Sequence, residues 1–345
     1  MSFQERAAPE VHSERSPLLL APELNSDGAS KQASKQALTK SPARKKAASK
    51  KPATRQTKGG PVRAVDSRIP WWNQVYFESS SRMAEVPDSS VDVIITSPPY
   101  FNIKDYSKDG RQQASHSEKN AADVGGLASY EDYIQAMLKV WKECERVLKP
   151  NGKLCINVPL MPMLKREMDT HHNRHIFDLQ SDIQQSILRN TGMFLMDLYI
   201  WNRTNGTKKL MFGSYPNPGN FYAQNTSEFI AVFVKGGKPE KKDKALQERS
   251  RLTKKEWVEY TQQIWNIPIP NKSDLAFGKH SALMPEEIAR RCIRLFSCEH
   301  DVVLDPFTGS GTTLKVAFEN RRKYVGYELY KSYGPVIQAK LDSVK

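Results

Sequence analysis

The hydrophobic pattern of the chain changes sharply near Ile69. Before that position apolar residues are scattered, whereas after it short apolar runs of strand length alternate with segments of helical periodicity. This alternation is typical of an α/β domain in which helices cover both faces of a mixed, mostly parallel sheet. The pattern therefore predicts a folded domain over residues 67–345 and a segment without a core over residues 1–66.

Six apolar runs have the length and the β-branched or aromatic content of buried strands. They are residues 91–95, 153–158, 194–201, 229–234, 301–305 and 324–327. Because helical segments separate several of these runs, we expect most of the strands to pair in parallel.

Three segments between these runs are predicted helices. Ser129 with Asp132 gives a capping box before the first, which ends at the turn-forming residues 149–152. One face of this helix carries Tyr133, Ile134, Met137, Trp141, Cys144 and Leu148. Pro285 stands at the first position of the second helix. Its apolar face holds Ile288, Cys292, Ile293 and Phe296, and residues 312–320 form the third helix.

Charge adds detail to the first segment. The 345 residues carry a net charge of +14, and residues 31–60 hold many Lys and Arg but no acidic residue. Most of the rest is Ala, Ser, Thr, Gln, Pro and Gly, so this part buries too little apolar surface to offset the entropy of ordering. We therefore expect residues 1–66 to be a disordered basic tail.

A basic excess favours a polyanionic partner, most commonly nucleic acid, because neutralised phosphates release counterions. Residues 41–46, Ser-Pro-Ala-Arg-Lys-Lys, resemble a nuclear localisation signal and the basic tails of chromatin proteins. Two interpretations stay open for the tail. It is either a nuclear address with chromatin contacts, in a eukaryotic setting, or a solubilising, nonspecific arm.

Other classes of protein are disfavoured. No run of about 18 apolar residues occurs, so we expect no membrane span and an intracellular protein. The four cysteines form no Cys-x-x-Cys pair and suit a reducing compartment as free thiols. His171, His172 and His175 have no accompanying cysteine or carboxylate constellation, so we expect a surface loop there and no metal.

A strand, a glycine turn and a helix follow one another over residues 301–320. Glycines remove side chains from the turn, so the backbone can approach a ligand at the carboxyl end of the strand. Glu328 ends the next strand 23 residues after Asp305, where an acid typically accepts hydrogen bonds from ribose hydroxyls. The predicted cofactor-binding residues are Asp305, Pro306, Phe307, Thr308, Gly309, Ser310, Gly311, Thr312 and Glu328.

A rigid proline pair follows the strand at residues 91–95. The predicted catalytic residues are Ser97, Pro98, Pro99 and Tyr100. The prolines bias the segment to extended geometry, so it displays carbonyls, a hydroxyl and one ring but no strong nucleophile. That suits methylation of an exocyclic amine: a Ser97 oxygen and the Pro98 carbonyl would accept its two hydrogens, and Tyr100 would stack on the base. A base must leave the duplex to reach such a site.

Together, Ser-Pro-Pro-Tyr at 97–100 and Asp-Pro-Phe-Thr-Gly-Ser-Gly-Thr at 305–312 resemble the S-adenosylmethionine-dependent DNA amino-methyltransferases. The catalytic motif comes first, which is the circularly permuted order of the family's β class. The resemblance covers about residues 72–345 and implies a Rossmann-like methyltransferase fold with S-adenosyl-L-methionine as cofactor. Since Ser-Pro-Pro-Tyr usually accompanies N4-cytosine methylation in this family, it also implies direct in-line transfer to the N4 amine of a flipped cytosine in DNA.

The resemblance extends to two flanking segments. Residues 75–93 look like the family's opening hairpin region, although Phe77-Glu78 stands where the family often has a cofactor-contacting Gly-Asp. Residues 280–285, His-Ser-Ala-Leu-Met-Pro, are similar to the segment that precedes the family's cofactor-flanking helix. This likeness implies that His280 and Ser281 lie near the methionine end of the cofactor.

Two alternatives stay open. N6-adenine methylation is the nearest, because both amines need similar acceptors, although the family usually pairs it with Asp-Pro-Pro-Tyr. The other is a catalytically inactive DNA-binding module that tethers chromatin. A protein-glutamine methyltransferase usually has Asn before Pro-Pro-Tyr and the reverse motif order, and this chain has neither.

Three polar segments are the predicted DNA-contacting insertions: residues 101–128, 202–225 and 235–275. The first follows the catalytic motif directly, so we expect a lid that orders on DNA. The predicted DNA contacts are Lys104, Tyr106, Lys108, Arg111, Arg203, Lys208, Lys209, Lys254 and Lys255, with Trp257 and Trp265 as further candidates for target recognition. A homodimer is a further option that the sequence leaves open.

Overall fold

The computed structural model describes residues 70–101, 122–162, 175–205, 215–219, 223, 225–280 and 282–344. The chain divides into two units, Met1–Val62 and Arg63–Lys345, and every described residue belongs to the second. The predicted tail, residues 1–66, lies outside the described residues. Within the described ranges, no helix combines the length and the apolar character needed to cross a membrane.

Eight strands of the described chain form one sheet in the order β1, β10, β9, β2, β3, β7, β6, β8. β7 runs antiparallel to its neighbours β3 and β6, and the other pairings are parallel, so the sheet is mixed and mostly parallel as predicted. The strands are β1 (Gln74–Tyr76), β2 (Val91–Thr96), β3 (Leu148–Pro159), β6 (Met193–Arg203), β7 (Ser227–Lys235), β8 (Ile264–Ile267), β9 (Val302–Asp305) and β10 (Lys323–Tyr327). A separate two-stranded sheet pairs β4 (Met161–Pro162) with β5 (Ile176–Phe177).

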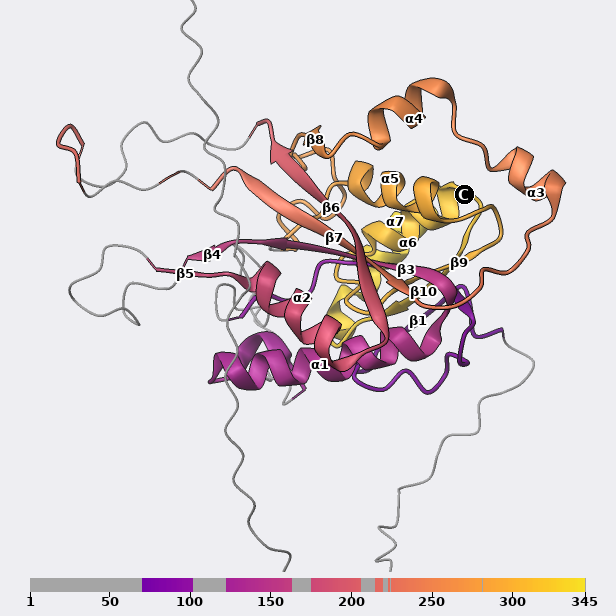
Figure 1. The fold of residues 1–345 in the computed structure, drawn as a ribbon, viewed down its shortest axis with the longest axis horizontal. Helices are drawn as coiled ribbons and strands as arrows, with labels where there is room; N and C mark the ends of the chain where they lie inside the picture. The colour runs from indigo at the N-terminus through magenta and orange to yellow at the C-terminus, as the bar shows by residue number, and fades with distance from the viewer. Residues whose placement is uncertain are drawn as a thin grey trace, which may run out of the picture. The chain divides into compact units, whose positions relative to one another are not determined.

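Helices cover both faces of the sheet (Figure 1). One face carries α1 (Tyr130–Val147) and α2 (Leu179–Asn190), and the other carries α5 (Glu286–Phe296) and α6 (Thr312–Glu319), with α7 (Gly334–Asp342) packed on α6. β2 lies between the two layers: Ile94 joins the core under α1, whereas Val93 and Ile95 join the core under α5. Burial on both faces explains why the centre of this strand is continuously apolar.

The predicted elements are present with small shifts at their ends. The Ser129 hydroxyl caps α1 by accepting a hydrogen bond from Asp132 N at 3.3 Å. Leu148, predicted as helical, is instead the first residue of β3. Val91 pairs with Leu148 and Val93 with Lys153, so the predicted turn residues 149–152 bulge out of β3, with Asn151 in the left-handed region (φ 65°).

The prediction of an opening hairpin over residues 75–93 is wrong. β1 pairs with β10, and β2 lies between β9 and β3, so the two strands are not neighbours. The physical reason is that the apolar β2 is buried on both faces at the centre of the sheet, whereas β1 completes the sheet at its edge beyond β10.

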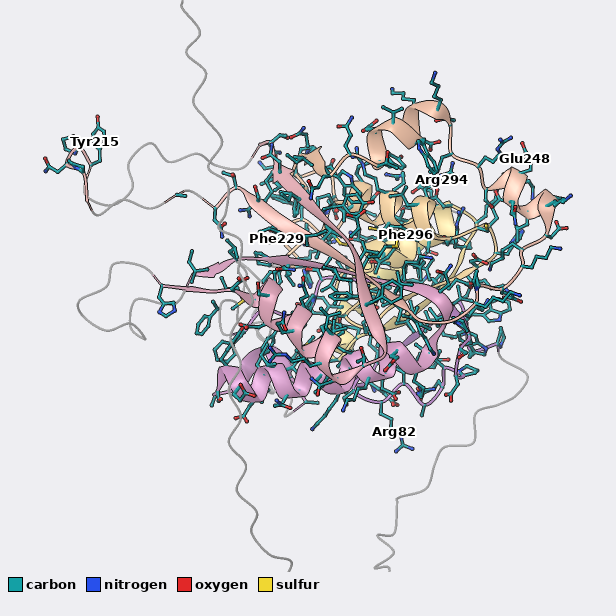
Figure 2. All side chains as sticks on the ribbon, viewed as in Figure 1. Arg82, Tyr215, Phe229, Glu248, Arg294 and Phe296 are labelled. Carbon is teal, nitrogen blue, oxygen red and sulfur yellow. The ribbon has the colours of Figure 1, made fainter. Side chains whose placement is uncertain are left out.

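Residues 235–275 contain more regular structure than their composition predicts. They form α3 (Lys244–Arg249), α4 (Lys254–Tyr260) and the edge strand β8. Arg294 of α5 reaches this segment, donating to Arg251 O at 2.8 Å and pairing with Glu256 at 3.3 Å (Figure 2). Trp265 is fully buried and stacks on Tyr199, so its prediction as a candidate for target recognition is wrong.

Candidate active site

The two predicted motifs meet at the carboxyl ends of β2 and β9, which are adjacent in the sheet. Thr96 Oγ1, at the end of β2, donates a hydrogen bond to Asp305 Oδ1, at the end of β9, at 2.8 Å. The bond joins residues 209 positions apart and is buried. It therefore places Ser97, the next residue after Thr96, beside the start of the glycine turn.

Asp305 is a buried acceptor at this junction, with 3% of its surface exposed. Its carboxylate also accepts a hydrogen bond from Phe307 N at 3.0 Å. Burial raises the pKa of Asp305 to about 6, although hydrogen bonds from Thr313 and Thr96 act in the opposite direction. At neutral pH the side chain is therefore mostly ionised and fixes both motifs.

The two glycines of the turn have different tasks. Gly309 has a φ of 52°, and a Cβ built there would lie 2.9 Å from His280 Nε2, so only glycine lets the His280 ring close over the turn. Gly311, with a φ of 85°, is the N-cap of α6, and its Cβ would lie 3.2 Å from the backbone of Ile337 in α7. Unlike Gly309, it does not border the cavity described next.

Glu328 follows β10 and points its carboxylate at the turn. Its Oε2 accepts from Gly309 N at 2.8 Å and its Oε1 from Tyr330 N at 2.9 Å. Burial raises the pKa of Glu328 to about 7, with these backbone hydrogen bonds acting in the opposite direction. The acid thus changes protonation in the physiological range, and it stands where the sequence predicts a ribose acceptor.

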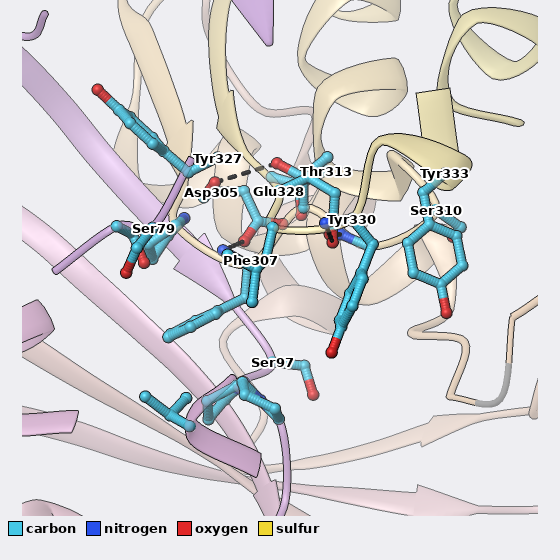
Figure 3. Close-up of a pocket in the computed structure, with 18 of the residues that line it drawn as sticks. Ser79, Ser97, Asp305, Phe307, Ser310, Thr313, Tyr327, Glu328, Tyr330 and Tyr333 are labelled. Atoms are coloured by element: carbon cyan, nitrogen blue, oxygen red, sulfur yellow. Dashed lines mark hydrogen bonds between the residues drawn. The ribbon is translucent and has the colours of Figure 1, made fainter. Parts of the chain in front are cut away.

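The first cavity opens over this turn (Figure 3) and comprises about 970 Å³ of space that is partly open to solvent. Of the predicted residues it is bordered by Ser97, Pro98, Pro99, His280, Asp305, Pro306, Phe307, Thr308, Gly309, Ser310, Thr312 and Glu328. Residues that the sequence missed also border it: Ser79, Ser80, Asp123, Val124, Met284, Thr313, Tyr327, Tyr330 and Tyr333.

Glu78 also borders the first cavity, at the loop after β1. It follows Phe77 where the resembled family often has Gly-Asp, so an acid reaches this position despite the altered motif. Also at the border of this cavity, the Tyr330 hydroxyl donates to Asp123 Oδ2 at 2.7 Å. Nothing local in the sequence signals that contact, because the two residues are more than 200 positions apart.

The second cavity shares Ser97 and His280 with the first. Tyr100 also lines it, with 7% of its surface exposed, and its hydroxyl lies 2.9 Å from Ser97 Oγ in a hydrogen bond. The Tyr133 hydroxyl of α1 donates to Pro99 O at 2.9 Å and holds the proline pair in place. Three further polar residues line this cavity from strands that no motif marks: Asn157, Arg203 and Glu228.

The remaining predicted residues lie in several places. Lys254 and Lys255 are exposed at the start of α4, and Trp257 of the same helix is exposed. His175 is exposed and stacks on Phe177. In the described ranges no group of three or more His, Cys, Asp or Glu side chains is placed to hold a metal ion. Outside the described residues lie Lys104, Tyr106, Lys108, Arg111, His171, His172, Lys208, Lys209 and Ser281.

Comparison with known proteins agrees with this geometry. The model of the N6/N4 DNA methylase family matches residues 91–339. The Type II methyltransferase M.MjaI of Methanocaldococcus jannaschii is 31% identical over 283 residues, which cover 78% of this chain and 91% of that protein. M.MthZI of Methanothermobacter thermautotrophicus, another Type II methyltransferase, is 27% identical, with 78% of this chain and 76% of that protein covered.

Two solved structures share the architecture. TTHA0409 from Thermus thermophilus, complexed with S-adenosyl-L-methionine, aligns with a TM-score of 0.60 at 27% identity, over 79% of this chain and 93% of that one. The cytosine-N4-specific PvuII DNA methyltransferase aligns with a TM-score of 0.55 at 19% identity, over 77% and 85%, which bears on the fold alone. These likenesses confirm the predicted Rossmann-like methyltransferase fold.

The family match spans most of the chain and includes both motifs that Thr96 and Asp305 join. The 31% identity to M.MjaI extends over nearly the whole of that relative. The chain therefore belongs to the N6/N4 DNA methylase family.

Proposed function

We propose that the protein is a DNA methyltransferase that transfers a methyl group from S-adenosyl-L-methionine to the N4 amine of cytosine. The observation that carries this proposal is the position of Ser97, which borders both cavities. In this assignment the first cavity holds the cofactor and the second holds the base. Ser97 then stands where the methyl donor and the amine meet.

The residues of the first cavity fit the cofactor, which is the ligand of TTHA0409. The buried Glu328 carboxylate accepts hydrogen bonds from ribose hydroxyls, and Phe307 offers an aromatic face to the adenine. Gly309 leaves space for close approach, and His280 flanks the methionine end. When bound, the cofactor supplies an electrophilic methyl group on a positively charged sulfur.

The second cavity suits a base that has left the duplex. Tyr100 hydrogen-bonds Ser97, so the ring that stacks on the base also orients the hydroxyl that meets the amine. Ser97 Oγ and the Pro98 carbonyl accept amine hydrogens, which makes the nitrogen lone pair more available for attack. The amine nitrogen would take the methyl group as the carbon–sulfur bond of the cofactor breaks, leaving a neutral thioether, and one amine proton would pass to solvent. Positioning of the amine supplies most of the catalysis, and no covalent intermediate with the protein forms.

The choice of cytosine rests on Ser97 as the first residue of its motif, the form that usually accompanies N4-cytosine methylation in this family. N6-adenine methylation is the second candidate, because the matched family includes both kinds of enzyme by its description. Outside the cavities, the exposed Lys254 and Lys255 are proposed phosphate contacts.

Nucleoside mass spectrometry tests the proposal after the full chain has reacted with unmodified duplex DNA and S-adenosyl-L-methionine. We expect N4-methylcytosine, and at least about tenfold less of it from Ser97→Ala, which loses one amine acceptor. N6-methyladenine without N4-methylcytosine would move the target to adenine. Normal cofactor binding with no methylated base would reject the enzyme and favour an inactive DNA-binding module.

A further inference from the structure

A row of polar side chains crosses the sheet at the second cavity. Thr96 of β2 pairs with Ile156 of β3, so the next residues, Ser97 and Asn157, are neighbours at the carboxyl ends of two parallel strands. Both line the second cavity. Asn157 therefore stands beside the predicted catalytic motif, although 60 positions separate it from Ser97 in the chain.

Glu228 of β7 connects Asn157 to the far side of the cavity. Asn157 Nδ2 donates to Glu228 Oε2 at 2.8 Å, and Arg203 Nη1 of β6 lies 3.4 Å from Glu228 Oε1. Arg203 is held a second time, because its Nη2 donates to Asn225 O. Asn157 and Glu228 are both more than nine-tenths buried, so the carboxylate fixes the amide and the guanidinium in defined orientations.

One acceptor and one donor remain after these bonds. In the part of the chain that the structure describes, Asn157 Oδ1 and Arg203 Nε are buried and have no hydrogen-bond partner. Buried polar atoms without partners are unfavourable and rare. Asn157 and Arg203 both line the cavity beside Ser97, so a buried unpaired acceptor on one and a buried unpaired donor on the other indicate a ligand that presents a donor and an acceptor together.

We propose that Asn157 and Arg203 read the amidine edge, H₂N–C=N, of the target base. Asn157 Oδ1 accepts the amine hydrogen on the side of the ring nitrogen, and Arg203 Nε–H donates to that nitrogen. The other amine hydrogen is then shared between Ser97 Oγ and the Pro98 carbonyl, which the motif alone would have given one hydrogen each. Glu228 is a positioning residue, because it acts through the other two.

On the Watson–Crick edge this pair of groups belongs to cytosine and to adenine, which both place an amine beside an unprotonated ring nitrogen; guanine carries such a pair only on its sugar edge, at N2 and N3. Thymine and guanine place a carbonyl beside an N–H, so each would set like groups against Asn157 and Arg203 and be rejected. The inference rests on the proposed function, since it gives the second cavity its base-reading groups. It also moves Arg203 from a predicted DNA contact of unspecified kind to a contact with the base itself.

Base analogues test the contact with the ring nitrogen. After sequencing has located the methylated site, the full chain is given duplexes carrying that site with either the natural base or an analogue whose ring nitrogen is replaced by CH, 3-deazacytosine or 1-deazaadenine. The intact chain should lose about ten- to a hundredfold in kcat/KM on the analogue, as expected for a hydrogen bond from a charged donor. On the natural base, Arg203→Met should have a kcat/KM lower than that of the intact chain by a similar factor. In this variant the analogue should lower kcat/KM little further, because the contact with the ring nitrogen is already gone.

Arg290→Met is the matched control. The Arg290 side chain is 28% exposed against 24% for Arg203, it also pairs with glutamates, and it borders neither cavity. In Arg290→Met the analogue should lower kcat/KM by the same factor as it does in the intact chain. Asn157→Leu should lower kcat/KM by the same factor on both duplexes, since the amine is present in both.

Cofactor affinity, measured by calorimetry, should be unchanged in Arg203→Met, which separates base reading from a structural role. If the analogue lowers kcat/KM by the same factor in Arg203→Met as in the intact chain, the inference is overturned. The proposed methyl transfer would not be affected by that result. Cofactor binding without any DNA methylation by the intact chain would reject the proposed function, and this inference with it.

Discussion

The two cavities that share Ser97 are built in opposite ways. The first is bordered by the glycine turn after β9 together with the segments that follow β1, β2 and β10, and its acids Asp305 and Glu328 are held partly by backbone N–H groups. The second is bordered by side chains from separate strands and by the segment between β8 and α5, and its polar strand residues Asn157, Arg203 and Glu228 are held mainly by one another. A backbone-built site tolerates little change in shape, whereas a side-chain-built site can change what it reads by single substitutions.

This difference fits a division of labour under the proposed function. The cofactor is the same in every methyl transfer of this kind, so its site can be a compact local motif. The base and its surroundings differ between enzymes, so the groups that read it gain from coming from independent strands. If the division is real, changes in one cavity should leave the other largely intact.

Asp305→Ala should give the largest effect. It removes the acceptor of Thr96 Oγ1 and Phe307 N and leaves both donors without a partner in a buried place. We expect cofactor affinity in calorimetry to fall about a hundredfold, equivalent to about 3 kcal/mol. Asn157→Leu, in the second cavity, should keep the affinity of the intact chain, and a comparable loss there would contradict the separation of the two sites.

Arg291→Met should weaken the support of the second cavity. The Arg291 side chain is 6% exposed, lies over the rings of Tyr260 at 5.0 Å and Trp265 at 5.4 Å, and pairs with Glu287 at 2.9 Å. These contacts hold α4 and β8 against α5, and β8 pairs with β6, which carries Arg203. We expect the free energy of unfolding in urea to fall by about 2 kcal/mol.

DNA methylation should suffer more from Arg291→Met than cofactor affinity does. The matched control is Arg290→Met on the same helix, whose ion pairs are more exposed and should contribute at most about 1 kcal/mol. Cofactor affinity that falls as steeply as methylation would show that the two cavities are mechanically one unit.

Glu328 should make the first cavity sensitive to pH. Its pKa is raised to about 7, and the ionised carboxylate accepts hydrogen bonds from ribose hydroxyls more strongly than the protonated acid does. Cofactor affinity should therefore rise about tenfold between pH 6 and pH 8, with Asp305 adding to the loss on the acid side through its pKa of about 6. In Glu328→Gln this rise in cofactor affinity should be largely absent. An unchanged rise would show that Glu328 does not contact the cofactor.

The same pKa acts on stability in the opposite sense. In the unfolded chain Glu328 has the ordinary pKa of 4.5, so it loses its proton at a lower pH than in the folded chain. The cofactor-free protein should therefore lose stability as pH rises from 4.5 through 7. The loss is about 3 kcal/mol if the whole difference in pKa is realised. Glu328→Gln should accordingly be more stable than the intact chain at pH 8, and urea denaturation at pH 5 and pH 8 should show the gap closing in acid.

The smallest effect should come from a surface that belongs to neither cavity. Lys254 and Lys255 are exposed at the start of α4, and we propose that they meet DNA phosphates. The double change to Ala should lower DNA affinity for all sequences alike and reduce the slope of log affinity against log salt by about two. Base preference and cofactor affinity should not move, and an unaltered salt slope would exclude these lysines from the DNA contact.

Local patterns predicted much of the fold. The runs ending at Thr96, Asp305 and Tyr327 are strands in the structure because each consists mostly of apolar, β-branched or aromatic residues. Helices α2 and α7 were not predicted. In α2 the buried apolar residues recur only every fourth position, which is too sparse a pattern to predict a helix. α7 begins with Gly334-Pro335, a pair that indicates a turn, although proline is also accepted at the start of a helix.

The sequence by itself determined the glycine turn and the acid of the first cavity. Its chemistry lies in consecutive residues around Gly309 and in Glu328, one strand later, and the geometry of strand, turn and helix is local. The order of the two motifs, with Ser97 ahead of Asp305, also needed no structure.

Only the tertiary structure decided the second cavity. Asn157, Arg203 and Glu228 come together because β7 runs antiparallel between β3 and β6 in one particular register. Side chains alternate between the faces of a strand, so a shift of one residue would turn Glu228 to the other face and separate Asn157 from Arg203. That register depends on the packing of the whole sheet between its helices, and no short stretch of sequence specifies it.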